Sequence, residues 1–446
     1  MRGARSPSTR HLPSRPPSAP PDSQRWYLSY AQLGLVVAGI APIVLPLLAA
    51  RSGGPSAPGL VMAGFNLGML VAPLWGALAD RTGLHRPIYV MGLVTVAAGI
   101  GAFDLRPGLG WFTVMALVIG LAASATATVA NLFITERHPK ESWGARFGWL
   151  QTAYGAGQVV GLTLAGAFGV TRAPLALALA ALAAVLGAAM FRVVPASTRV
   201  ERPVSPRHHP RHGGLVLGTF MSHVHLPHLI QALRKLPQLA RGGRSPFLTF
   251  LAGWFLGNVG SAAVFSFYPL VMGHAFGLAA GAASWAFAAV AGLGLLLYGP
   301  AGAGAKRLGA ASIYRGGLAL RLVALVFLGL VAFVHVGFRA WLAIGGFGVV
   351  VLAWSLLSVA SSDLAAETSS LSQGEAMGLY AATAAVAAVV GSLLGGLAAV
   401  IAGYAGLVWV AAVFVAFSLA LAPRRRPRSG HEGAGRVPEG APSSSA

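Results

Sequence analysis

Residues Gly76–Arg86 read GALADRTGLHR, and this short charged segment separates two long apolar runs. An acid, two arginines and a histidine fall within it, while Gly83 supplies the backbone freedom that a tight turn requires. The small residues around Gly76 let two helices approach closely. A weaker copy, GAGAKRLG at Gly302–Gly309, begins 226 positions later. We interpret both segments as tight turns at the edge of a membrane, each joining two spanning helices.

The composition is that of a membrane protein. Hydrophobic residues make up 56% of the 446 residues and charged residues only 10%, against about 25% charged residues in a soluble domain. Apolar runs of about 18 or more residues recur along the chain, and each is long enough to cross a bilayer. The chain has no cysteine, which excludes disulfides. We therefore predict an all-α integral membrane protein.

Twelve spans follow from these apolar runs, and the first contains Pro42 and Pro46. The predicted spans are residues 26–50, 59–79, 87–105, 110–134, 145–168, 173–194, 247–272, 277–300, 313–335, 339–361, 376–398 and 404–422.

The distribution of basic residues predicts the orientation of the spans. If both termini are cytoplasmic, only Arg51, Arg106, Arg172 and Arg339 of the 32 Lys and Arg residues fall in loops on the outer side. The net charge of +21 then belongs to loops that face anionic lipid, and no basic domain is left to bind a phosphate backbone. The expected partners are the lipid bilayer and a small-molecule substrate, with no nucleic acid. The excess of Arg over Lys indicates a bacterial inner membrane.

The chain is doubled. Gly148–Leu150 and Gly378–Tyr380 begin similar spans 230 positions apart, and Pro46–Leu48 resembles Pro269–Val271. Two similar sets of six spans are typical of a parallel repeat about an axis along the membrane normal. The predicted organisation is a disordered cytoplasmic tail (1–25), a six-helix half (26–195), a cytoplasmic linker with an amphipathic helix (196–245), a second six-helix half (246–422) and a second disordered tail (423–446).

Gly76, Leu78, Asp80, Arg81 and Gly83 match the signature G-x-L-a-D-R-x-G-R-K, and on these residues the chain resembles the major facilitator superfamily. The match departs at Leu84 and His85, where the family has two bases. The resemblance implies a transporter that works by alternating access, with Asp80 as half of a cytoplasmic latch whose partner lies near Gly374–Gly378. A simple topology signal remains the alternative. The predicted latch residues are Gly76, Asp80, Arg81, Gly83, Arg86, Glu136 and Arg146.

The fifth span carries a second resemblance, because Gly148, Gly157, Gly161 and Gly166 approach the antiporter signature G-x8-G-x3-G-P-x2-G-G of drug exporters. Leu162 and Ala165 depart from it. A stripe of glycines makes a smooth ridge against which another helix can pack and rock, although general small-residue packing gives the same pattern. The stripe favours the drug-efflux members of the family.

We expect no charged side chain at the centre of any span. A charge there costs about 2.5–3.5 kcal/mol, so a retained one would indicate function. Proton coupling through a buried carboxylate therefore has no support, and a coupling proton stays open as a partner. The remaining titratable candidates lie at span ends and are interpreted as interfacial anchors: Asp104, His274, His335 and Asp363.

Neutral polar and aromatic residues inside the spans are the candidates for a substrate cavity near the midplane. Amides, phenols and indoles without fixed charge suit a neutral or weakly polar organic molecule, although any one amide could instead bond a neighbouring helix. The candidates are Gln32, Asn66, Asn131, Gln151, Tyr154, Gln158, Trp254, Asn258, Phe265, Tyr268 and Trp354, with Gln32, Asn258 and Gln158 the strongest.

These features predict a secondary active transporter that exports hydrophobic or amphipathic small molecules. An importer or facilitator of a neutral metabolite and a transport-inactive receptor or scaffold remain alternatives. The sequence shows no nucleophile–base pair and no P-loop, so we predict no enzyme activity, no cofactor and no ATP hydrolysis. The linker histidines fit no defined metal spacing, and no resident metal is predicted.

Overall fold

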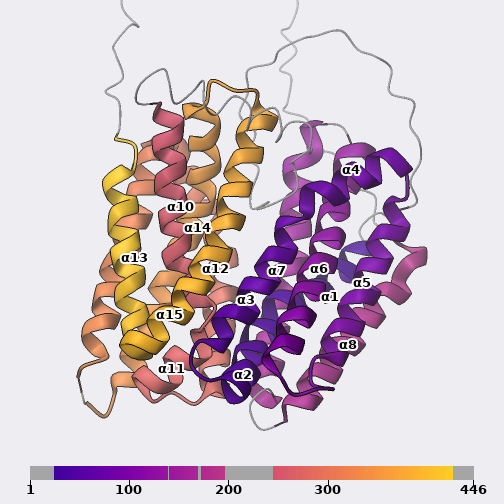
Figure 1. Cartoon of the computed structure of the whole chain (residues 1–446). Coiled ribbons are helices and arrows are strands. Elements are labelled where there is room, and N and C mark those ends of the chain that lie inside the picture. The colour runs from indigo at the N-terminus through magenta and orange to yellow at the C-terminus, as the bar shows by residue number, and fades with distance from the viewer. Residues whose placement is uncertain (1–24, 139, 169–171, 196–244, 335, 425–446) are drawn as a thin grey trace, which may run out of the picture.

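The computed structural model describes residues 25–138, 140–168, 172–195, 245–334 and 336–424, and every regular element within them is a helix (Figure 1). The predicted tails, the amphipathic helix of the linker and His335 lie outside the described residues, apart from a few residues at the ends of the tails. The predicted all-α membrane fold is confirmed.

The first half of the chain contains six spans. The first span combines α1 (Trp26–Gly34), the π-helical turn η2 (Leu35–Ile40) and α2 (Ala41–Gly53), and the second combines α3 (Ala57–Leu70) and α4 (Ala72–Thr82). The other four are α5 (His85–Ala102), α6 (Leu109–Arg137), α7 (Lys140–Phe168) and α8 (Ala173–Ala189), the last followed by the 3-10 turn η3 (Met190–Arg192).

The second half repeats this arrangement. Its spans are α10 (Pro246–Phe265) with α11 (Tyr268–Phe276), then α12 (Ala280–Leu308), α13 (Ala310–Val331) and α14 (Arg339–Thr368), and finally α15 (Gln373–Leu421), which holds two. Gly403 divides α15, because its φ of 67° lies in the left-handed region that a helix interior excludes. Within the described residues, nine of these segments are long and apolar enough to cross a membrane by length and composition alone. The division of α15 and the addition of α5 and α7 make the twelve predicted spans.

The turns between spans define two faces of the molecule. One face carries the turn at Gly83, where φ is 69°, and the ends of α6, α12 and α14; we call it the Gly83 face. The opposite face carries the turn at Gly54, where φ is 76°, and the ends of α5 and α11; we call it the Gly54 face. The Gly83 face is at the top of Figure 1.

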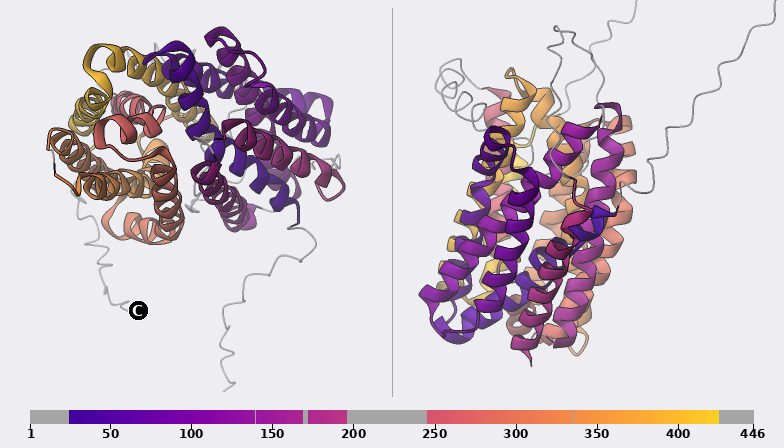
Figure 2. Two further views of the ribbon diagram at one scale, coloured as in Figure 1. Left: turned by 90° about the horizontal axis from the view of Figure 1, so that it is seen from below. Right: turned by 90° about the vertical axis from the view of Figure 1, so that its right-hand side faces the viewer.

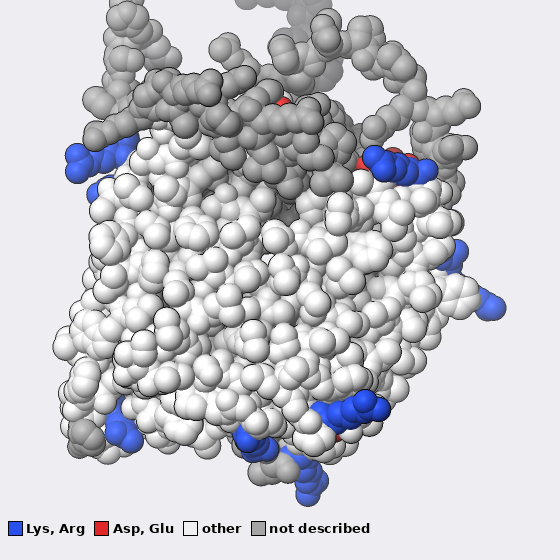
Figure 3. Space-filling model, viewed as in Figure 1, with Lys and Arg blue, Asp and Glu red and all other residues white. Residues whose placement is uncertain are grey.

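The outer surface between the two faces suits a bilayer. Large apolar side chains such as Leu296, Trp341 and Ile401 are more than two-thirds exposed. In the view of Figure 3 the broad middle of the molecule is uncharged, and most of the basic side chains lie toward the two faces. Exposed apolar area on this scale is stable against lipid and not against water.

The two halves meet at the Gly54 face and diverge toward the Gly83 face (Figures 1 and 2). A Cβ atom on Gly59 of α3 would lie 2.5 Å from the carbonyl oxygen of Ser392 in α15, so the two backbones touch there. The indole Nε1 of Trp285 in α12 donates a hydrogen bond of 3.1 Å to the carbonyl of Thr163 in α7. Small residues and single hydrogen bonds therefore close this end of the seam between the halves.

Candidate functional site

A cavity of about 830 Å³ lies in the seam between the two halves. The first half lines it with η2, α2, α3 and α7, and the second half with α10, α12, α14 and α15. Along α7 the lining runs from Ala145, near the start of that helix at the Gly83 face, to Gln158 in its middle. The cavity therefore extends from mid-membrane depth toward the Gly83 face.

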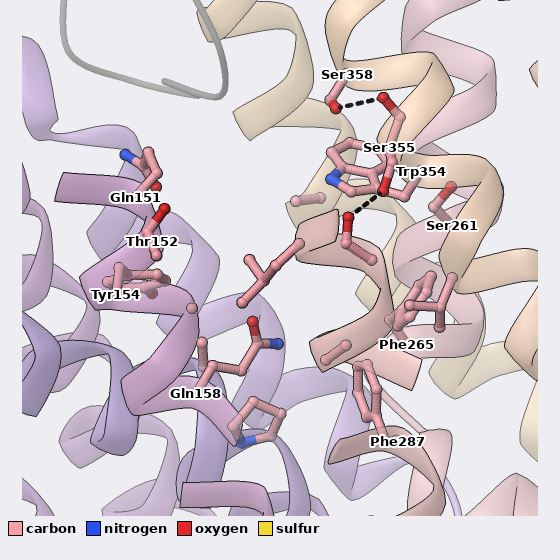
Figure 4. Close-up of a pocket in the computed structure, with 18 of the residues that line it drawn as sticks. Gln151, Thr152, Tyr154, Gln158, Ser261, Phe265, Phe287, Trp354, Ser355 and Ser358 are labelled. Carbon is pink, nitrogen blue, oxygen red and sulfur yellow. Dashed lines mark hydrogen bonds between the residues drawn. The ribbon is translucent and has the colours of Figure 1, made fainter. Parts of the chain in front are cut away.

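Seven of the eleven predicted cavity residues line this space. In Figure 4, Gln151, Tyr154 and Gln158 on α7 lie across an open gap from Phe265 on α10 and Trp354 on α14. The seven residues are Asn66, Gln151, Tyr154, Gln158, Asn258, Phe265 and Trp354.

The structure places the other four candidates away from the cavity. Gln32 faces α8: its Cβ atom lies 3.1 Å from the position that a Cβ on Gly187 would occupy. Asn131 donates a hydrogen bond of 2.7 Å to the carbonyl of Ala127, one turn earlier in its own helix. The Tyr268 hydroxyl donates one of 2.7 Å to the carbonyl of Ala283, and the Trp254 ring stacks on Tyr380 at 4.9 Å between ring centroids.

Several cavity residues were not predicted, and the polar ones among them all carry hydroxyl groups. The Ser355 hydroxyl donates 3.1 Å to the carbonyl of Gly294, and the Ser358 hydroxyl donates 3.3 Å to the carbonyl of Ser355 (Figure 4). Such hydroxyls can be satisfied by a helix backbone, so their presence in a span carries little signal. Spacing could have found one of them, because Ser261 lies at helical distance between Asn258 and Phe265. The additional lining residues include Thr152, Ser261, Ser266, Phe287, Ser355 and Ser358.

A polar cluster joins the halves at the end of the cavity nearer the Gly54 face. The Asn66 amide Nδ2 donates hydrogen bonds to the Ser392 hydroxyl at 3.1 Å and to the carbonyl of Ala388 at 3.4 Å. The Ser392 hydroxyl also lies 2.8 Å from that of Ser266. Asn66 belongs to the first half and its partners to the second, so these hydrogen bonds must break if the halves separate here.

The expectation of an uncharged interior is wrong at Arg321. This residue is the twelfth of the 22 in α13, near the centre of that span, and only 2% of its side chain is exposed. One guanidinium nitrogen, Nη1, donates 2.7 Å to the Ser261 hydroxyl, and Nη2 donates 3.2 Å to the carbonyl of Val350. The guanidinium carbon lies 5.4 Å from the centroid of the Trp354 ring. A single arginine in a strongly apolar run barely changes the hydropathy of that run, so hydropathy does not distinguish this span from an uncharged one.

Four of the predicted latch residues lie in or beside one compact cluster on the Gly83 face. Asp80 lies in the last turn of α4, His85 begins α5 and Glu136 lies in the last turn of α6. Donor atoms of these three side chains lie within 4.8 Å of one another. His85 Nε2 is 3.0 Å from Glu136 Oε1, and this contact with the carboxylate raises the pKa of His85 despite the burial of its ring. Gly83 forms the turn, and Gly76 packs α4 against Thr128 of α6.

The other three latch candidates point elsewhere. Arg81 is exposed. Arg86 donates to the carbonyl of Phe191, and its guanidinium carbon lies 5.5 Å from the centroid of that ring. Arg146 on α7 lies beside the Tyr27 hydroxyl of α1. His85, a departure from the family signature, therefore takes the central place that the sequence did not assign to it.

Asp80, His85 and Glu136 are also the one group of His and acidic side chains, among the described residues, whose donor atoms lie close enough together to share a metal ion. One imidazole and two carboxylates could bind a divalent cation. His85 and Glu136 form an ion pair within this group when His85 is protonated.

The four glycines of the fifth span have different neighbours. Gly157 and Gly161 let the backbone of α7 approach the first span closely. A Cβ on Gly157 would overlap the carbonyl oxygen of Ala31, and a Cβ on Gly161 would overlap that of Leu35. Gly166 faces the Trp285 ring of the other half, and Gly148 lines the cavity with open space beside it. The stripe thus serves packing within a half, the seam and the cavity at different positions.

Comparison with known proteins identifies the family. Residues 26–370 match the family model described as Major Facilitator Superfamily. The chain belongs to the major facilitator superfamily. It is therefore a multi-pass membrane transporter, as the loop signature around Asp80 indicated.

Solved structures of the superfamily share the fold at low identity. A nucleoside transporter, NupG, covers 90% of this chain and 97% of its own at 14% identity, with a TM-score of 0.66. A D-xylose–proton symporter covers 90% and 97% at 15% identity, with a TM-score of 0.67. A bacterial homologue of the human lysosomal transporter Spinster, in an inward-facing and unoccupied conformation, covers 91% and 96% at 13% identity, with a TM-score of 0.65.

One curated relative is similar over a shorter stretch. It is a homologue of the multidrug resistance efflux pump PmrA from Lactococcus lactis subsp. lactis (strain IL1403), 30% identical over 97 residues. The match spans 22% of this chain and 24% of that protein.

Proposed function

We propose that this transporter exports hydrophobic or amphipathic small molecules by alternating access, and that the structure represents its state open to the cytoplasm. The main support is the cavity of about 830 Å³ between the halves, which is lined mainly by aromatic, aliphatic and neutral polar side chains. Such a lining favours organic molecules with apolar bodies. The Gly83 face, toward which the cavity extends, is assigned to the cytoplasm because the outer loops carry few basic residues.

Alternating access needs one end of the seam to open as the other closes. The closed end is held by the Asn66–Ser392 and Trp285–Thr163 hydrogen bonds and by the contact at Gly59. None of these contacts involves a charged side chain, so their separation exposes no unpaired ion. We assign Asp80 to a latch that binds the start of α15 when the Gly83 end closes.

Export is favoured over import by two sequence features. The 97-residue similarity to an efflux-pump homologue is one, and the partial antiporter signature in α7 is the other. The nucleoside and xylose transporters share the fold alone, so they do not favour import of those compounds by this chain.

The experiment measures accumulation of a panel of fluorescent hydrophobic compounds in cells that express the protein, with and without a protonophore. Export predicts lower accumulation of at least one compound than in cells that carry the empty vector. Higher accumulation would instead support an importer, and unchanged accumulation across the panel would support a receptor or scaffold.

Orientation is tested separately, and the natural lack of cysteine makes this direct. Leu84→Cys and Ser52→Cys place single thiols at exposed positions on the Gly83 and Gly54 faces. A membrane-impermeant maleimide added to intact cells should label the Ser52 variant and leave the Leu84 variant unlabelled until the cells are opened. The reverse pattern would overturn the assignment of the cytoplasmic face.

A further inference from the structure

The two walls of the cavity differ in charge: a positively charged side chain, Arg321, lies behind the wall that the second half contributes. Arg321 lies about 16 Å along α13 from Ala310, at a rise of about 1.5 Å per residue, which places its charge deep in the membrane-spanning region. An arginine keeps its charge in proteins, and a buried charge in a membrane is rare unless it serves a function. The facing side chains on α7 that line the cavity, such as Gln151, Tyr154 and Gln158, are neutral.

The hydrogen bonds of Arg321 leave part of its guanidinium unused. A guanidinium has five N–H donors. The Ser261 hydroxyl and the carbonyl of Val350 accept from Nη1 and Nη2, while Nε is buried without a hydrogen-bond partner in the structure. No Asp or Glu in the described part of the chain pairs with Arg321. The positive charge is therefore solvated only by neutral dipoles and by the face of the Trp354 ring.

Arg321 stands directly behind the cavity wall. Two of its side-chain neighbours, Ser261 and Trp354, line the cavity. The Ser261 hydroxyl donates its proton to the carbonyl of Gly257 at 2.7 Å and accepts from Arg321, so its oxygen is held in a fixed position. Across a single layer of side chains in a medium of low dielectric constant, a positive charge is weakly screened. The cavity surface at Ser261 and Trp354 therefore carries a positive potential.

We propose that this surface is a subsite for an anionic oxygen group of the substrate, and that Arg321 is its counter-charge. The substrate class is then an amphipathic organic anion, whose apolar body lies against Phe265 and Phe287. Its carboxylate or similar group lies at the surface formed by Ser261 and Trp354, attracted by the charge of Arg321 and not by the Ser261 proton, which is donated to Gly257. The proposal rests on the function proposed above and narrows it, because an export cavity without Arg321 would show no preference for anions.

The test uses purified full-length protein in lipid nanodiscs and three ligands with the same ring system and different head groups. They are naphthalene-2-carboxylate, naphthalene-2-carboxamide and naphthalen-2-ylmethylammonium, and calorimetry measures their dissociation constants. The wild-type protein should bind the carboxylate about tenfold more tightly than the carboxamide, the ratio expected for one charge-assisted interaction, and should bind the ammonium ligand most weakly.

Two variants and one matched control separate charge from packing. Arg321→Gln keeps a hydrogen-bonding side chain and should bind carboxylate and carboxamide about equally, whereas Arg321→Lys should keep the preference for the carboxylate. Arg315→Gln is the control, because Arg315 lies on the same helix and donates to the carbonyl of Ala422 instead of reaching the cavity. It should bind all three ligands as the wild type does.

Each outcome decides the matter. A wild-type protein that binds the ammonium ligand as tightly as the carboxylate would overturn the proposal whatever the variants do, and so would an unchanged carboxylate preference in Arg321→Gln. If Arg321→Gln does not fold, loss of the preference in Ser261→Ala with binding of the carboxamide retained would support the subsite, and an unchanged preference would overturn it. Binding without any head-group preference overturns the subsite alone, while no binding of any ligand to the wild type overturns the proposed cavity as well.

Discussion

The two faces of α7 make different kinds of contact. Toward its own half, Gly157 and Gly161 lie against backbone carbonyl groups of α1 and η2, where nothing can move aside. Toward the other half, a Cβ on Gly155 would meet the end of the Leu295 side chain at 2.6 Å, and Gly166 faces the Trp285 ring. The contact with α1 and η2 is therefore fixed by backbone. The contact with α12 combines side chains that can change rotamer with one backbone approach, between Gly166 and Gly281.

This difference separates the parts that move from the parts that do not. A half packed backbone against backbone can rotate as a unit, because small displacements inside it would create overlaps at once. A seam closed by side chains, a few hydrogen bonds and the backbone contacts at Gly59 and Gly166 can open without breaking the packing inside either half. In the proposed transport cycle, α7 thus stays with α1 and changes its contacts with α12. The predictions below test this assignment.

The largest effect is expected from locking the seam. The double variant Asn66→Cys/Ser392→Cys replaces two side chains whose polar atoms lie 3.1 Å apart with thiols. The natural chain has no cysteine that could compete with them. Oxidation should form a disulfide that holds the Gly54 end closed and abolishes transport, and reductant should restore the transport rate. Transport is measured with any compound that passes the accumulation assay.

The single variants Asn66→Cys and Ser392→Cys control for loss of the native side chains, and neither should respond to oxidant. Continued transport by a fully cross-linked double variant would mean that the seam does not open at Asn66. Alternating access through the Gly54 end would then have to be abandoned.

The next effect concerns stability and compares two glycines of the same helix. Gly161→Ala forces a methyl group against the Leu35 carbonyl and should lower the free energy of unfolding by about 1–3 kcal/mol, as overpacking of a core does. Gly155→Ala meets the flexible end of Leu295 and should leave the melting temperature nearly unchanged, with a slower transport rate. Thermal unfolding of the purified variants measures the first effect. Equal melting temperatures would remove the distinction between the two faces of α7.

Some features of the structure could be predicted from the sequence and others could not, and the difference lies in how strong a sequence pattern each feature requires. Twelve spans were predictable because an apolar run of membrane length is a strong signal. The direction in which each side chain points was not, because adjacent positions on a helix differ by about 100° and a uniformly apolar span carries no periodicity. Gln158 and Gln32 looked alike in sequence, yet one lines the cavity and the other faces α8.

Arg321 shows a different limit. The sequence shows its charge, but the apolar residues around it give the segment the hydropathy of an ordinary span. Its partners Ser261 and Val350 belong to other spans, 60 and 29 residues away. Only the packed structure shows that this charge stands behind the cavity wall. Similarly, the sequence shows His85 only as a mismatch to the loop signature. Its contact with Glu136, which makes it part of the cluster, is visible only in the structure.

A smaller effect is expected at the Gly83 end of the seam, which is open in this structure. Asp80→Asn should leave membrane insertion intact and reduce transport by about fivefold to tenfold, since loss of 1–1.4 kcal/mol from one end state changes its population by that factor. Asp104→Asn is the matched control, being the same change at an exposed position near the opposite face. Transport at the wild-type rate in Asp80→Asn would reduce the charged turn to a topology signal.

The smallest effect should be a pH dependence that originates in His85. Its contact with the Glu136 carboxylate raises the pKa of the imidazole above the ordinary value of 6.5, so the charged form is favoured in this conformation. The stabilisation is complete below the ordinary pKa and is lost as the pH rises through the raised pKa. The melting temperature of the purified protein should therefore fall over that range, and His85→Gln should remove the step.

The control must separate this cluster from other titrating groups. His274→Gln changes the ring that stacks on Tyr404, 4.7 Å away and near the Gly54 face, and the step should persist in that variant. If the step instead disappears with His274, or survives in His85→Gln, then the pH dependence arises outside the Asp80–His85–Glu136 cluster.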